Sequence, residues 1–137
     1  MIKYKQITEL PEYYIEEKIE QFLREDFADE DVTTLACVSD NKIIRGYIEA
    51  QSELVLCGNP VIKKIFSNCS ELQINYNDGE LVPEYSVIAT FKGNARYILS
   101  RERVLLNILQ RLSGVATITR QFVQKVQKYD IKILDTR

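Results

Sequence analysis

Residues 101–119, RERVLLNILQRLSGVATIT, organise the rest of the chain. Their apolar side chains recur along one helical face, as expected for a helix packed against a core. These apolar positions are Val104, Leu105, Ile108, Leu109 and Leu112. Gly114 then stands in a run of small residues, and glycine tolerates the positive φ at which helices commonly end. The stretch therefore predicts a buried helix, a tight turn at residues 113–117, and a second helix over residues 117–129.

The part of the chain before this helix, residues 1–100, has the pattern of an α+β domain. Residues 11–25 carry one apolar stripe, and Pro11 suits the first turn of a helix. Alternating apolar residues, rich in Ile, Val, Tyr and Leu, then predict strands at 42–51, 53–57, 72–76 and 85–91, with a short helix at 60–66. We therefore expect helices packed on a small, mostly antiparallel sheet.

The last residues of the chain have the pattern of a buried strand, IKIL at 131–134, followed by Asp135, Thr136 and Arg137. Parallel α/β barrels place their chemistry at the C-terminal ends of their strands. A complete barrel takes roughly 250 residues, so residues 101–137 are expected to supply only its linking helices and first strand. The predicted division is an α+β domain at 1–100 and the start of an open α/β barrel at 101–137.

The composition excludes several classes of function. The chain has 137 residues and no histidine, so Ser-His-Asp and Cys-His catalytic systems and histidine-containing metal sites cannot be built from it. Proton transfer would fall to Asp, Glu, Lys or Tyr. The net charge of −2 gives no electrostatic reason to expect nucleic acid or an anionic membrane as a partner.

The cysteines and the hydropathy indicate a reducing, cytoplasmic setting. Cys37, Cys57 and Cys69 are odd in number and lack CxxC spacing, so we interpret them as small core residues rather than disulfides or metal ligands. No run approaches the ~18 apolar residues of a membrane span, and the first residues lack the apolar core of a signal peptide.

The acidic segment at residues 24–34, REDFADEDVTT, has two interpretations. Clustered carboxylates could bind a divalent cation through oxygen, although the spacing does not match an EF-hand loop. The interpretation that we prefer is a solvated connection in which Asp31 and the threonines after it bind backbone amides.

Taken together, these segments resemble the N-terminal half of the quinolinate phosphoribosyltransferase family. LRED at 23–26 and DVTT at 31–34 resemble the family's LxED…GDVTT, and VLCG at 55–58 resembles its GVLAG segment. The other matching segments are DG at 78–79, GNARYIL at 93–99, ERVLLN at 102–107, LSGVATIT at 112–119 and DTR at 135–137. Glu30 and Glu84 stand where the family usually has glycine, which affects two loops rather than the fold.

The resemblance implies an enzyme that joins quinolinate to phosphoribosyl pyrophosphate. The products are nicotinate mononucleotide for NAD synthesis, pyrophosphate and carbon dioxide. The resemblance also implies a homodimer or a dimer-based oligomer, and Mg²⁺ as cofactor. In the family the metal ligands and the catalytic groups lie beyond the position of Arg137, so no catalytic or metal-binding residue is predicted in this chain.

Three substrate-binding residues follow from the resemblance. Quinolinate is a dicarboxylate, for which an arginine fork is a suitable binder. Arg137 matches the family arginine that contacts quinolinate at the end of the first barrel strand, and Thr136 matches a polar neighbour in that pocket. Arg103 matches the arginine of the ERV motif, which reaches the active site of the neighbouring subunit in the family dimer.

Two alternatives remain open at this point. A related group linked to molybdenum transport operons, the ModD-like proteins, shares the ERxxLN and SGxAT motifs. The chain could also be an inactive half-length homologue that acts as a dimerisation or regulatory module. A phosphoribosyltransfer assay with quinolinate separates the first alternative from the enzyme, and the length of the native polypeptide separates the second.

Overall fold

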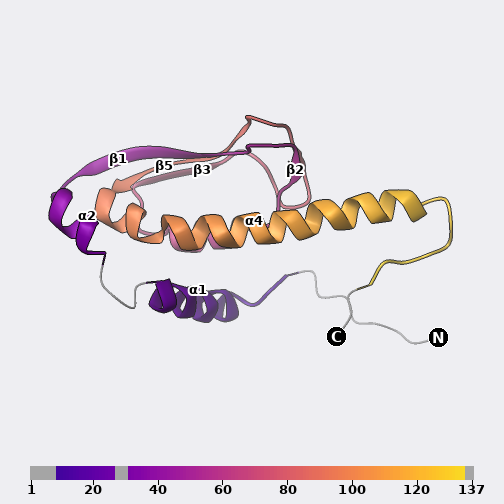
Figure 1. Cartoon of the computed structure of the whole chain (residues 1–137), viewed down its shortest axis with the longest axis horizontal. Helices are drawn as coiled ribbons and strands as arrows, with labels where there is room; N and C mark the ends of the chain where they lie inside the picture. Colours follow the sequence, from indigo (N-terminus) through magenta and orange to yellow (C-terminus); the bar gives the residue numbers. More distant parts are fainter. Residues whose placement is uncertain (1–8, 27–30, 135–137) are drawn as a thin grey trace.

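The computed structural model describes residues 9–26 and 31–134, and Figure 1 shows the arrangement of the elements. The elements in chain order are α1 (Glu12–Asp26), α2 (Val32–Cys37), β1 (Ile43–Glu49), β2 (Leu54–Val55), α3 (Asn59–Ile65), β3 (Glu71–Ile74), β4 (Leu81–Val82), β5 (Val87–Asn94) and α4 (Ala95–Val126). The predicted α+β domain is confirmed.

The strands form two small antiparallel sheets. The larger sheet has the order β1-β5-β3, and β2 pairs with β4 in a separate two-stranded sheet. Strand β5 continues through Gly93 to Asn94, because these two residues pair with Ile44 and Ile43 of β1. Strand β4 was not predicted, since two residues are too few to show alternation.

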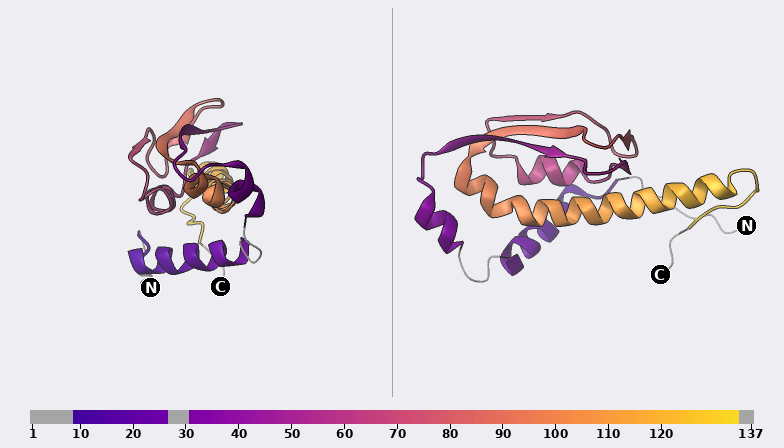
Figure 2. Two further views of the ribbon diagram at one scale, coloured as in Figure 1. Left: turned by 90° about the vertical axis from the view of Figure 1, so that its left-hand side faces the viewer. Right: turned by 45° about the horizontal axis from the view of Figure 1, so that its top comes forward.

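The helices form two layers beneath the larger sheet. Helices α3 and α4 lie beneath it, α4 contacts β5, and α1 packs on α3 and α4 from the opposite side (Figure 2). The core lies between these layers and includes Leu56, Ile62, Ile65, Val82 and Leu105, each less than 2% exposed. The other face of the larger sheet is uncovered in the described part of the chain.

Helix α4 runs without a break through Gly114, so the predicted turn at residues 113–117 is wrong. The hydroxyl oxygen of Ser113 accepts a hydrogen bond from the Cys57 backbone N–H at 3.1 Å, and that of Thr117 accepts one from the Val55 N–H at 2.9 Å. Thr117 also donates to the Ser113 carbonyl at 2.7 Å. The hydroxyl groups of Ser113 and Thr117 therefore bind the backbone of residues 55–57 to α4, which is continuous here. In the part of the chain that the structure describes, no atom outside the helix backbone lies within 4 Å of the position of a Cβ at Gly114, so Gly114 makes no close contact with another described element.

The predicted buried strand at residues 131–134 is also wrong. These residues are irregular, and Ile131, Ile133 and Leu134 are 56%, 42% and 57% exposed. A strand needs a neighbouring strand for its backbone hydrogen bonds, and no described strand lies beside this segment. Large apolar side chains in the second predicted helix, residues 117–129, are exposed as well, with Ile118 at 56% and Phe122 at 55%.

The prediction that all three cysteines are small core residues is only partly correct. Cys37 is exposed, whereas Cys57 and Cys69 are half-buried, and burial raises the pKa of both of these thiols. Among the described helices, none combines the length and the apolar character that crossing a bilayer requires.

Candidate functional site

Arg103 lies on the exposed side of α4, in its third turn, and faces the C-terminal end of α1. Its Nη1 atom is 3.3 Å from Oδ1 of Asp26, the last residue of α1. The Arg103 side chain is 74% exposed, whereas the Asp26 side chain is 23% exposed. The geometry therefore presents a solvent-accessible guanidinium in contact with one partly exposed carboxylate.

A groove of about 550 Å³ between α1 and α4 adjoins this ion pair. Its lining includes Phe22, Val104, Ile108 and Leu112 as apolar residues, with Asn107 and Arg111 among the polar ones. Asp26 lines the groove and also binds Arg103, so it joins the two features. A concave, mostly apolar surface with a few polar groups is typical of small-molecule sites.

Asp31 stands at the start of α2, where the positive charge of Arg103 acts on its carboxyl group. It is the N-cap residue, and its Oδ1 accepts a hydrogen bond from the Thr34 backbone N–H at 3.0 Å, as the second interpretation of the acidic segment predicted. Hydrogen bonds from the Thr34 side chain and backbone lower the pKa of the Asp31 carboxyl, and the positive charge of Arg103 adds to the effect. The short helix begins at this residue because its carboxylate satisfies an otherwise unpaired amide.

The lowered pKa of Asp31 predicts an acid-dependent stabilisation. A carboxyl whose pKa is lower in the folded than in the unfolded chain stabilises the fold above the unfolded pKa, and this contribution is lost as the pH falls. We expect the stability advantage of the wild type over Asp31→Asn to shrink between about pH 5 and pH 3, since asparagine caps helices without titrating. Urea unfolding at a series of pH values measures the difference, and an advantage that stays constant over this range would contradict the prediction.

Arg96 has a structural role. Its Nε donates to the Val38 carbonyl at 2.7 Å, its Nη2 donates to the Leu35 carbonyl at 2.9 Å, and Asp40 forms an ion pair with it. The side chain therefore fastens the C-terminal end of α2 to α4. Thr117 also binds a backbone group, because its hydroxyl oxygen accepts a hydrogen bond from the Val55 N–H.

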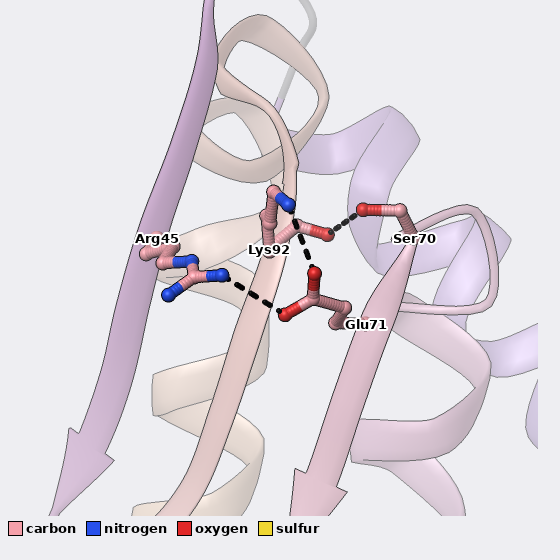
Figure 3. A network of polar contacts seen from close by, with 4 residues as sticks. All are labelled: Arg45, Ser70, Glu71 and Lys92. Atoms are coloured by element: carbon pink, nitrogen blue, oxygen red, sulfur yellow. Dashed lines mark hydrogen bonds and ion pairs between the residues drawn. The ribbon is translucent and has the colours of Figure 1, made fainter.

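A second concave surface, of about 790 Å³, lies on the uncovered face of the larger sheet. Figure 3 shows that Glu71 bridges two cations there: Lys92 Nζ is 2.9 Å from Oε1, and Arg45 Nη2 is 3.5 Å from Oε2. The Lys92 hydrogen bond is the main cause that lowers the pKa of Glu71. Glu71 thus offsets part of the charge of both cations, and we assign no ligand to this surface.

The other predicted site residues cannot be placed. Thr136 and Arg137 lie outside the described residues.

Within residues 9–26 and 31–134, no group of three or more His, Cys, Asp or Glu side chains is arranged to hold a metal ion. These residues do not fit a magnesium site, so we assign no step to a metal. Asp26 was not singled out from the sequence, although it closes the LRED motif at 23–26.

Comparison with known proteins adds independent information. The family model "Quinolinate phosphoribosyl transferase, N-terminal domain" matches residues 31–113. A probable nicotinate-nucleotide pyrophosphorylase (carboxylating) of Bacillus subtilis is 38% identical over 87% of this chain and 42% of its own length. A protein of the same name from Synechocystis is 33% identical over 93% of this chain and 44% of its own length. The chain thus spans less than half the length of these two relatives.

Solved structures agree with the sequence relatives. The nicotinate-nucleotide pyrophosphorylase from Francisella tularensis superposes with a TM-score of 0.89 at 30% identity, over 98% of this chain and 49% of that protein. NadC from Streptococcus pyogenes superposes with a TM-score of 0.85 at 29% identity, over 96% of this chain and 48% of that protein. The similarity extends over nearly the whole of this chain.

Proposed function

The chain belongs to the quinolinate phosphoribosyltransferase family, through that family's N-terminal domain, and from this premise we propose that it serves in nicotinate mononucleotide synthesis. The reaction transfers the phosphoribosyl group of phosphoribosyl pyrophosphate to quinolinate and releases pyrophosphate and carbon dioxide. The observation that carries the proposal is the family match over residues 31–113, which includes Arg103 and the part of α4 up to Ser113. The proposed setting is the cytoplasm, in the pathway to NAD.

Arg103 is the residue of this chain that we assign to quinolinate. Among the described residues, Asp26 contacts only Nη1 of its guanidinium. A guanidinium has five N–H donors in a planar fork, so the edge formed by Nε and Nη2 can still take a carboxylate with two parallel hydrogen bonds. Such a contact positions the anion without taking part in proton transfer.

The exposed apolar residues at the C-terminal half of α4 support the proposed assembly. Val115, Ile118 and Phe122 are each more than half exposed, and they recur at helical spacing on one side of the helix. A contiguous apolar strip of this kind marks a surface that another part of the protein covers. We assign it to the barrel of the proposed enzyme, with a homodimer as the expected oligomer and Mg²⁺ bound by residues outside the described ones.

The first test is the intact mass of the protein from its native source, together with a phosphoribosyltransfer assay with quinolinate. A mass near twice 15.9 kDa, with formation of nicotinate mononucleotide, is the expected result. A long polypeptide that does not use quinolinate would favour the ModD-like alternative. A mass of 15.9 kDa without turnover would favour the dimerisation or regulatory module.

The variant Arg103→Ala tests the assigned residue. We expect it to lower kcat/KM for quinolinate about 10- to 100-fold, because a hydrogen bond to a charged group contributes about 1.5–3 kcal/mol. Its thermal stability should change little, since exposed ion pairs contribute little to folding. Unchanged kinetics with reduced thermal stability would refute the assignment.

A further inference from the structure

We propose that Asp26 is a positioning residue, whose carboxylate holds the Arg103 guanidinium so that its remaining edge can bind a substrate carboxylate. The inference rests on the function proposed for Arg103 and adds a residue from a different helix. Asp26 and Arg103 are 77 positions apart in the sequence, and the fold brings them to 3.3 Å.

The unequal exposure of the two side chains indicates which one holds the other. Asp26 ends α1 with 23% of its side chain exposed, and its side chain is the shorter of the two, whereas 74% of the Arg103 side chain is exposed. An unrestrained arginine loses about 2 kcal/mol of rotamer entropy when it is immobilised. A contact with Asp26 before binding removes part of this cost, which is the physical basis of preorganisation.

Asp26 is unsuited to bind the substrate itself. Quinolinate carries two carboxylates, and a like charge placed against them would repel them. The role of Asp26 therefore has to act through Arg103. Among the described contacts, Asp26 reaches only Nη1 of Arg103, so the other guanidinium nitrogens remain available to a substrate carboxylate.

A merely structural ion pair would give a different result from a positioning pair. Exposed pairs contribute about 0–1 kcal/mol to stability, so the loss of the Asp26 charge should leave the unfolding midpoint nearly unchanged. If Asp26 positions Arg103, the loss appears instead in substrate affinity. An interaction made equally with the bound substrate and the transition state changes KM and not kcat.

The experiment compares Asp26→Asn with Glu25→Gln in the polypeptide at the length that its source makes. Both changes remove one negative charge from the C-terminal end of α1, but Glu25 accepts a hydrogen bond from Gln21 and has no described contact with Arg103. The measurements are KM and kcat for quinolinate and, by calorimetry, the Kd of phthalate as a non-reacting dicarboxylate. We expect Asp26→Asn to raise KM and Kd about tenfold with kcat within twofold, Glu25→Gln to leave all three unchanged, and Asp26→Glu to restore part of the affinity.

The outcomes separate this inference from the function on which it rests. If Arg103→Ala weakens phthalate binding and Asp26→Asn does not, the inference is overturned and the proposed function stands. A lower KM in Asp26→Asn, or an equal effect of Glu25→Gln, would also overturn it. If Arg103→Ala changes neither KM nor Kd, or if no dicarboxylate binds, the assignment of Arg103 fails and the inference fails with it.

Discussion

The double variant Ser113→Ala, Thr117→Val is expected to lose about 2–6 kcal/mol of folding stability, since each change leaves a backbone N–H without its partner at about 1–3 kcal/mol. Ser113 is 4% exposed and binds Cys57, and Thr117 binds the buried residue Val55. Valine keeps the branched shape of threonine, so the loss reports on the hydroxyl group.

The two hydroxyls fit the β2 segment because of a match in spacing. Residues four apart on a helix rise by about 6 Å, and residues two apart in an extended chain are separated by about 6.6 Å. Ser113 and Thr117 have the first spacing, and Val55 and Cys57 have the second. The two hydroxyl groups of α4 thus accept backbone hydrogen bonds from residues 55 and 57, as the carbonyl groups of a neighbouring strand would.

Urea unfolding followed by circular dichroism measures the effect. The matched control is Thr119→Val, which makes the same chemical change on an exposed position of the same helix. We expect the control to shift stability by less than about 0.5 kcal/mol. Equal stability of the double variant and the wild type would show that water replaces both hydroxyls.

The second large effect is expected for Leu105→Ala, which should cost about 2–5 kcal/mol through lost burial and the cavity left behind. Leu105 is 1% exposed and belongs to the core that α4 shares with the sheet and α3. Since domains of this size are stable by about 5–15 kcal/mol, this single change should lower the unfolding midpoint strongly.

Leu99→Ala on the same helix is the control, because Leu99 is 39% exposed. Its truncation removes the same atoms but leaves no closed cavity, so its cost should be clearly smaller. A loss at Leu99 as large as that at Leu105 would contradict the described packing of α4.

Elements with a regular local pattern could be predicted from the sequence. The apolar stripe that includes Ile19 predicted α1, and alternating apolar residues predicted most of the larger sheet. Pro60 predicted where α3 begins. The resemblance to the family also implied Arg103 as a candidate, and its exposure on α4 is compatible with that role. Thr136 and Arg137 remain predictions.

The errors arose where a local signal competes with a distant contact. Gly114 is a helix-ending signal on its own, yet α4 continues through it. Two hydrogen bonds hold this part of the helix. They join Ser113 to Cys57 and Thr117 to Val55, which are 56 and 62 positions apart in the sequence. The segment at 131–134 has a strand-like composition, but no described strand offers it a partner.

By itself, the sequence determined the types of the main elements and the family, because periodicity and motif order are local properties of the chain. Only the tertiary structure decided that α4 is unbroken and that Asp26 holds Arg103. Both depend on partners far away in sequence, and a hydrogen bond or ion pair forms only where folding brings its two groups within about 3 Å.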